Sequence, residues 1–315
     1  MSDYLWRRVG VIYQIYPPSF MDADNDGIGD LSGITQKLDY LQDLGIDAIW
    51  LSPVYLSPDV DFGYDVVNYR EIDPKYGGMP AFDKFLQAAH QRNIHVIMDL
   101  VLNHTSDQHE WFQQSKLSKD NFYRDWYIWK KARNGGKFPN NWKSRFGGSG
   151  WEWDHATEEF YFHMFFKQQP DLNWRNPKVV DEILDMIKFW LDKGVDGFRL
   201  DVFNAYYKNI NFADNPFKLG ITKFDQQNHI NDSDQPEMFG FLQKFRQLLD
   251  SYPERYSVGE TFMGDHHTAA KYVGDQALHA AFDFSFINGR YKASSFYKSI
   301  RSEERRVGKE CRSRW

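Results

Sequence analysis

An arginine and an aspartate stand two residues apart in the segment GFRLD, where together they could support a reactive carboxylate. Arg199 and Asp201 would share one face of an extended strand, because side chains alternate between its two faces. A guanidinium at this range favours the ionised carboxyl group, which lowers its pKa and suits a nucleophile. Such pairs also occur as structural ion pairs. The chemical interpretation of Asp201 therefore depends on its neighbours.

A second carboxylate, Glu260, ends the segment YSVGE. No cation adjoins it in the sequence, so we expect Glu260, rather than Asp201, to be the proton donor. If the two residues follow adjacent parallel strands, about 4.8 Å apart, their carboxyl groups can approach the separation of about 5 to 5.5 Å used in retaining glycoside hydrolysis. The pair therefore predicts a nucleophile and an acid/base.

The surrounding segments alternate between predicted strands and amphipathic helices. Strands are predicted at 9–16, 46–51, 94–102, 195–201, 256–260 and 280–286, and helices at 34–44, 80–91, 176–193, 237–249 and 267–273. This order predicts an α/β fold with a parallel sheet and crossover helices. We interpret it as a (β/α)8 TIM barrel that is incomplete, with about six of its eight strands. Barrel chemistry belongs at the carboxyl ends of strands, where Asp201 and Glu260 are placed.

Residues 105–173 interrupt the alternation and are rich in Trp, Gly and Asn. We expect them to form a small subdomain, subdomain B, inserted after the third strand and carrying binding residues on its loops. The catalytic barrel would then comprise residues 1–104 and 174–300.

The last fifteen residues, 301–315, read RSEERRVGKECRSRW and lack apolar periodicity. This peptide can be encoded by a common sequencing-library adapter. We therefore expect residues 301–315, which include Cys311, to be a non-native tail that is no part of the fold.

Composition restricts the class of partner. The net charge is −6 and no long basic run precedes residue 300, which disfavours nucleic acid. No apolar run approaches the roughly 18 residues of a membrane span, and the first residues lack an apolar signal core. We expect a soluble, cytoplasmic protein without a membrane partner. Aromatic residues make up 17% of the chain, which suits stacking on neutral sugars.

The loop DADNDGIGD, residues 22–30, matches the first part of an EF-hand-type calcium loop. The expected oxygen ligands are the side chains of Asp22, Asp24, Asp26 and Asp30, and the carbonyl of Ile28. Gly33 stands where an EF-hand has its bidentate acid, so the loop is no EF-hand. It predicts a structural Ca²⁺ (or Mg²⁺) site; the alternative is an acidic loop of Asx-turns.

Four motifs follow one another in a familiar order: MDLVLNHTSDQH (98–109), QPDLNW (169–174), GFRLDVFN (197–204) and VGE (258–260). The segments VIYQIYPPSF and DGIGDLSGI precede them. With these motifs the chain resembles glycoside hydrolase family 13, the α-amylase superfamily, and within it the oligo-1,6-glucosidase and α-glucosidase group.

The resemblance implies a role for each matching residue. Asp201 would be the nucleophile that forms a glucosyl-enzyme intermediate, Glu260 the acid/base, and Arg199 the residue that orients the nucleophile, with Asp99 supporting Arg199. The implied substrate-binding residues are His104 on the sugar, Tyr64 stacked beneath it, Asp61 at the non-reducing end, and Phe146, Phe165, Gln169 and Val202 in the pocket. The cation would be structural, and no organic cofactor is implied.

The implied activity is that of a retaining, exo-acting α-glucosidase on α-1,6- or α-1,4-linked short gluco-oligosaccharides. Val202 is similar to the residue of α-1,6-acting members, but one valine decides little. Three alternatives stay open: a transglycosylase, a relative acting on sucrose or trehalose phosphate, and a non-catalytic carbohydrate-binding barrel. The oligomeric state is not indicated.

One departure from the family concerns the segment after Glu260. Members carry an Asn-His-Asp segment after a later strand, and none occurs between Glu260 and Ile300. An arginine that would pair with Asp61 is also missing. Because an incomplete barrel exposes strand edges and core, we expect the 315-residue chain alone to be inactive and poorly folded.

Overall fold

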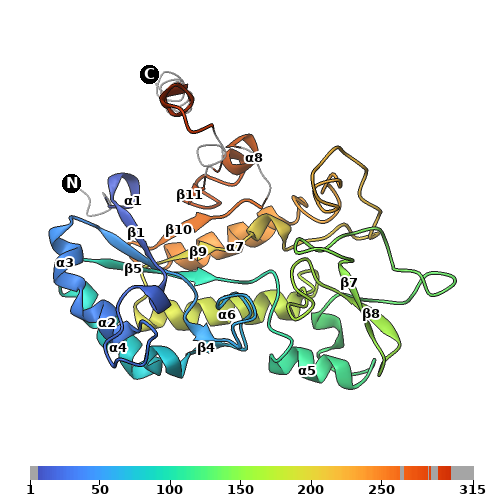
Figure 1. Ribbon diagram of the computed structural model, residues 1–315, viewed down its shortest axis with the longest axis horizontal. Coiled ribbons are helices and arrows are strands. Elements are labelled where there is room, and N and C mark those ends of the chain that lie inside the picture. The colour runs from blue at the N-terminus through green and yellow to red at the C-terminus, as the bar shows by residue number, and fades with distance from the viewer. Residues whose placement is uncertain (1–5, 263–265, 283, 285–289, 299–315) are drawn as a thin grey trace.

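The computed structural model describes residues 6–262, 266–282, 284 and 290–298 of the chain. Its centre is a six-stranded sheet, in which every neighbouring pair of strands is parallel (Figure 1). In spatial order the strands are β1 (Ile12–Ile15), β2 (Ala48–Leu51), β5 (His95–Leu100), β9 (Gly197–Leu200), β10 (Tyr256–Gly259) and β11 (Ala280–Ala281). The predicted parallel sheet is confirmed. The predicted sixth strand, 280–286, lies partly outside the described residues. The predicted tail, 301–315, lies wholly outside them.

The first strand begins later than predicted. Trp6–Val9 forms a short helix, α1, which ends where the Gly10 amide donates to the Trp6 carbonyl (2.9 Å). The Trp6 ring stacks on His95, with 4.1 Å between ring centroids. The Trp6 ring therefore covers the amino-terminal end of β5 before the chain enters β1.

Helices cover the outer face of the sheet (Figure 1). They are α2 (Leu31–Gln36), α3 (Leu38–Asp43), α4 (Gly78–His90), α6 (Pro177–Lys193), α7 (Met238–Asp250) and α8 (His266–Lys271). The single helix predicted over 34–44 is two helices that meet at Lys37. In α6 the Asn176 side chain caps the first turn, Pro177 supplies a fixed φ, and Gly194 ends the helix at φ +102°. Its buried face packs with Phe198 and Leu200 in the main core.

The sheet curls, as a barrel wall does. Trp50 of β2 lies 5.5 Å from Phe282, which follows β11, although three strands separate β2 from β11. In a flat sheet, rings from strands this far apart could not meet. The concave face therefore holds its own small core, which includes Ala48, Ile97 and Val258.

Between β5 and α6 the chain forms a separate body beyond the carboxyl ends of the strands (Figure 1). It contains α5 (Glu110–Leu117) and an antiparallel sheet of β6 (Trp129–Lys130), β8 (Glu159–Phe162) and β7 (Trp151–Asp154). These strands, of two to four residues, are too short to show alternation in the sequence. An antiparallel pair outside the main sheet, β3 (Tyr55–Leu56) and β4 (Asn68–Ile72), was likewise not predicted.

Single 3₁₀ turns complete the connections: η1 (Pro17–Ser19), η2 (Pro74–Tyr76), η3 (Arg124–Trp126) and η4 (Phe203–Ala205). Across the described ranges, none of the helices has both the length and the apolar character needed to cross a membrane.

Candidate active site

The two candidate carboxylates follow directly after neighbouring strands. The Asp201 amide donates to the Leu100 carbonyl, and the Glu260 amide to the Leu200 carbonyl, both at 2.9 Å. These bonds continue the parallel ladders β5–β9 and β9–β10 by one residue. Phe198 and Leu200 point to the helices, so Arg199 lies on the concave face. The strand register therefore brings Asp201 and Glu260 to one rim of the sheet.

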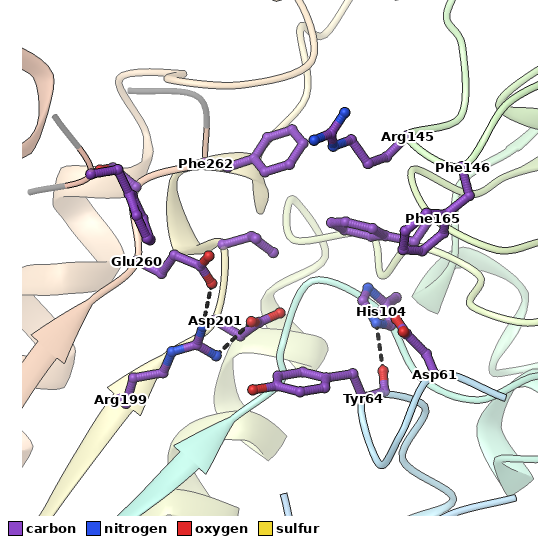
Figure 2. Close-up of a pocket in the computed structure, with 13 residues that line it drawn as sticks. Asp61, Tyr64, His104, Arg145, Phe146, Phe165, Arg199, Asp201, Glu260 and Phe262 are labelled. Carbon is purple, nitrogen blue, oxygen red and sulfur yellow. Dashed lines mark hydrogen bonds and ion pairs between the residues drawn. The ribbon is translucent and has the colours of Figure 1, made fainter. Parts of the chain in front are cut away.

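Arg199 contacts three carboxylates from adjacent strands. Its Nη1 donates to Asp99 Oδ1 (2.7 Å) and Asp201 Oδ1 (2.5 Å), and its Nη2 donates to Glu260 Oε2 (Figure 2). The Arg199 side chain is 6% exposed and that of Asp99 is fully buried. Asp99 Oδ2 also accepts from Trp50 Nε1 and Tyr64 OH, both at 3.1 Å. One buried cation thus positions the carboxylates of three strands.

The predicted depression of the Asp201 pKa is wrong. Burial raises the pKa of Asp201 above its ordinary value, and the attraction of Arg199 only opposes that rise. The physical reason is that burial outweighs the attraction of the single guanidinium, and the charge of the neighbouring Asp99 adds to the rise. Burial is also the largest effect on Glu260, followed by the charge of Asp201, and together they raise its pKa to about 7. A substantial fraction of Glu260 is therefore protonated near neutral pH, which agrees with its predicted role as the proton donor.

A cavity of about 640 Å³ opens in front of these groups (Figure 2). A cavity of this size holds a small organic ligand. The residues predicted from the sequence that line it are Asp61, Tyr64, His104, Phe146, Phe165, Arg199, Asp201, Val202 and Glu260. Val202 has φ +35°, a costly conformation for a β-branched residue. Strain of this kind is typical of a functional site.

Gln169 does not line the cavity. It is fully buried behind Asp61, and its Nε2 donates to Asp61 Oδ2 and to the Tyr64 carbonyl, both at 2.9 Å. Its Oε1 accepts from the Phe166 amide (2.9 Å), which fixes the orientation of the amide. The resemblance assigned Gln169 to the pocket wall; its place in the structure is one layer deeper, where it holds Asp61.

His104 is a neutral hydrogen-bond donor. Its Nε2 donates to the Tyr64 carbonyl (2.8 Å), and its Nδ1 accepts from Asn103 Nδ2 (3.2 Å). Burial lowers the pKa of His104 below its ordinary value. Both ring nitrogens are therefore engaged within the protein, and the ring lines the cavity as an uncharged group.

Four further residues of the cavity wall were not predicted from the sequence: Arg145, Thr261, Phe262 and Phe284. Three of them adjoin or closely follow a predicted site residue, since Arg145 precedes Phe146, and Thr261 and Phe262 follow Glu260. Proximity in sequence was the available signal. Phe284 follows β11 and lies in the predicted strand 280–286, for which no site residue was predicted.

A second buried ion pair, also missed, joins subdomain B to the barrel. Lys208 Nζ contacts Asp171 Oδ2 (2.9 Å) and donates to Asn103 Oδ1 (3.1 Å). Asn103 Nδ2 donates to Asp171 Oδ2 (2.9 Å), and the Met164 amide donates to Asp171 Oδ1 (2.8 Å). None of these residues lines the cavity. The cluster therefore fixes the backbone behind His104 without facing a ligand.

The acidic loop brings three of the predicted cation ligands together. Carboxylate oxygens of Asp22, Asp24 and Asp30 lie within 4.8 Å of one another, and Asp26 is not part of this group. The loop also contains Asx-turns, because Asp22 accepts from the Asn25 (2.6 Å) and Gly27 (2.9 Å) amides. Each carboxylate oxygen has further lone pairs, so the turns leave acceptor capacity for a hard cation.

Comparison with known proteins agrees with this geometry. Residues 14–306 match the family model of the alpha amylase catalytic domain. An oligo-1,6-glucosidase from Heyndrickxia coagulans is 48% identical over 297 residues, which are 92% of this chain and 52% of that protein. A probable alpha-glucosidase from Rhizobium meliloti (strain 1021) is 43% identical over 300 residues, 90% of this chain and 54% of that protein.

Among solved structures, the alpha-glucosyl transfer enzyme XgtA superposes with a TM-score of 0.91 at 44% identity. The match covers 95% of this chain and 58% of that enzyme. The chain spans about half the length of the curated relatives it matches. The family model, the relatives and the strand-end carboxylates agree, and the chain belongs to the α-amylase family of catalytic domains.

Proposed function

We propose that the protein carrying this chain is a retaining, exo-acting α-glucosidase of short gluco-oligosaccharides with α-1,6 or α-1,4 linkages. One observation carries the proposal: Arg199 contacts both Asp201 and Glu260 at the ends of adjacent strands, and the pKa of Glu260 is raised to about 7. A nucleophile and a proton donor held by one cation are the two groups that retaining hydrolysis requires. The names of the relatives, an oligo-1,6-glucosidase and a probable alpha-glucosidase, support this activity.

In the first step, an Asp201 oxygen attacks the anomeric carbon and Glu260 gives its proton to the glycosidic oxygen. The bond to the leaving group breaks, and a glucosyl ester forms on Asp201. The ester has no negative charge, so the charge that helped to raise the Glu260 pKa is removed. The Glu260 carboxylate then takes a proton from water, which displaces Asp201 with net retention.

Exo action is supported by the wall opposite Glu260. Asp61 faces the cavity while Gln169 holds its other side, and the Tyr64 ring lies beside it (Figure 2). A carboxylate fixed in this way can accept hydrogen bonds from the hydroxyl groups of a terminal glucose. We therefore place the non-reducing end against Asp61.

Glucosyl transfer is the second candidate, and the similarity to an α-glucosyl transfer enzyme favours it. The same Asp201 ester serves both reactions, since only the acceptor differs: water in hydrolysis and a sugar hydroxyl in transfer. Products formed from concentrated maltose separate the two. Glucose alone indicates hydrolysis, and trisaccharides indicate transfer.

The proposed roles are tested by the leaving-group dependence of Glu260→Gln in the complete gene product. A nitrophenolate leaves without a proton, so kcat/KM on p-nitrophenyl α-glucoside, which reports formation of the glucosyl ester, should fall far less than kcat/KM on maltose or isomaltose. Asp201→Asn should abolish activity on all of them. Equal losses of kcat/KM on all substrates in Glu260→Gln would contradict the assignment of Glu260 as the acid.

For the acidic loop we propose a structural Ca²⁺ or Mg²⁺ held by Asp22, Asp24 and Asp30. Three convergent carboxylates are a suitable donor set for a hard cation. Bound there, the cation would offset their mutual repulsion and brace the loop, and the cavity residues would still carry the chemistry.

A further inference from the structure

One cation at the mouth of the cavity has no role in the mechanism above. Arg145 of subdomain B lines the cavity, and its side chain is 44% exposed, whereas that of Asp201 is 9% exposed. Figure 2 shows its guanidinium beside Phe262, on the side of the cavity opposite Asp61 and Tyr64. Because Glu260 protonates the leaving group and Phe262 follows it by two residues, Arg145 lies on the leaving-group side.

The protein holds the Arg145 guanidinium in place but leaves its hydrogen-bond donors unused. The Arg145 amide donates to the Met164 carbonyl (2.7 Å), and the guanidinium carbon lies 5.5 Å from the centre of the Phe224 ring. Its nearest carboxylate contact is Asp225 Oδ1, at 3.8 Å from Nη1, which is too long for a hydrogen bond. Within the described residues, no hydrogen bond uses its side-chain N–H groups. The fork of N–H groups of the Arg145 guanidinium is therefore free to donate hydrogen bonds to oxygen atoms of a ligand at the mouth of the cavity.

A second group on this side of the cavity also lacks a side-chain hydrogen bond. Thr261, directly after Glu260, lines the cavity and is 1% exposed. Its Oγ1 has no hydrogen-bond partner among the residues that the structure describes. A buried hydroxyl without a partner costs stability, unless a ligand supplies one.

We infer that Arg145 and Thr261 select the leaving group by binding the hydroxyl groups of a neutral sugar in that position. The inference rests on the proposed α-glucosidase function and concerns what that site accepts. A neutral sugar is favoured over an anionic group because Asp61 and Asp201 line the same cavity and would repel an anion. An aryl leaving group offers few hydroxyls, so it makes little use of these donors.

The test compares a sugar leaving group with an aryl one in the complete gene product. For Arg145→Ala, we expect the ratio of kcat/KM on maltose or isomaltose to kcat/KM on p-nitrophenyl α-glucoside to fall at least about tenfold. Arg145→Lys keeps the charge but loses the fork, so its ratio should lie between those of the wild type and Arg145→Ala. Thr261→Val should lower the same ratio by a smaller factor, and it provides a separate test if Arg145→Ala fails to fold.

Arg133→Ala is the matched control. Arg133 is an exposed arginine of the same subdomain, with a similarly long contact to an aspartate of the same loop, Asp214 (3.6 Å), and it does not line the cavity. Its ratio should equal that of the wild type. A ratio unchanged in both Arg145→Ala and Thr261→Val would overturn the inference.

Two further outcomes are informative. A wild-type protein that prefers a phosphorylated disaccharide over maltose and isomaltose, and loses that preference in Arg145→Ala, would overturn the neutral-sugar assignment. A wild-type protein inactive on all of these substrates would refute the proposed function, and this inference with it. An active protein with an unchanged ratio refutes the inference alone.

Discussion

Two buried cations of this molecule are surrounded in different ways. Arg199 contacts the carboxylates of Asp99, Asp201 and Glu260, so carboxylates outnumber the cation three to one. Lys208 contacts one carboxylate, Asp171, and the remaining partners nearby are the neutral oxygens of Asn103 and Ala205. The first cluster cannot have all its carboxylates ionised at low cost, whereas the second is charge-balanced.

This difference in charge balance distinguishes a cluster that can carry out catalysis from one that only stabilises the fold. Burial, followed by the charge of Asp201, raises the pKa of Glu260 in the Arg199 cluster to about 7, so Glu260 can hold and release a proton near neutral pH. The cavity opens onto this cluster. The Lys208 cluster has no excess of carboxylates and no access to the cavity, so we expect it to contribute stability alone. Substitutions in the Arg199 cluster should therefore reduce activity more than stability, and substitutions in the Lys208 cluster should reduce stability more than activity.

The largest effect is expected from Asp201→Asn in the Arg199 cluster. An amide cannot form the glucosyl ester, so kcat should fall by about 10⁴-fold or more. The melting temperature should not fall, because the substitution removes one negative charge from an overcrowded site. Steady-state kinetics and thermal unfolding measure the two quantities. A large loss of stability would show that Asp201 is mainly a structural partner of Arg199.

Lys208→Met should have the converse profile. It leaves Asp171 buried without its cation, which should lower the free energy of unfolding by about 3 to 5 kcal/mol. Urea unfolding measures this loss. The double variant Lys208→Met with Asp171→Asn is the control, because removing both charges should restore part of the stability. A single variant as stable as the wild type would contradict the structural role of the cluster.

The pH dependence sharpens the same contrast. Glu260 must be protonated to act as the acid, so kcat/KM on maltose or isomaltose should decline as the pH rises through about 7. The raised pKa also means that the stability contributed by protonated Glu260 is fully present below pH 4.5 and is lost as the pH rises to about 7. In Glu260→Gln the decline in kcat/KM should vanish. A profile that stays flat to pH 9 in the wild type would argue against Glu260 as the acid.

The smallest effect is expected at the acidic loop. If Asp22, Asp24 and Asp30 hold a cation, then chelation by EDTA should lower the melting temperature by a few degrees, on the order of 2 to 4 °C, and added Ca²⁺ should restore it. Asp24→Asn should reduce the response. A melting temperature that changes with neither EDTA nor Ca²⁺ would contradict the proposed cation site and favour the alternative, a loop of Asx-turns.

The sequence was most informative where function and strand order coincide. Asp201 and Glu260 could be placed because each directly follows an apolar strand, and parallel strands deliver their carboxyl ends to one rim. Alternation of side chains along one strand placed Arg199 and Asp201 on the same face. These predictions used only local alternation and the order of elements, and the six-stranded sheet confirms that order.

What the sequence could not supply depends on contacts between distant residues. Asp99 and Glu260 reach Arg199 from 100 and 61 residues away. Burial, with the charge of Asp99 added to it, raised the Asp201 pKa that the adjacent arginine was expected to lower, and neither effect is visible in the local sequence. Lys208 meets Asn103 across 105 residues. Gln169 fell one layer behind the cavity because no local pattern distinguishes a wall residue from its support.

The most direct test of the account is to identify the residue that carries the covalent sugar. The complete gene product would be incubated with a fluorinated α-glucosyl fluoride, digested, and its peptides sequenced by mass spectrometry. The account predicts one glucosyl adduct on Asp201, and none when Asp201→Asn is treated in the same way. An adduct on Glu260 or elsewhere, or rapid turnover with inverted anomeric configuration, would contradict the assignment of Asp201 as the nucleophile held by Arg199.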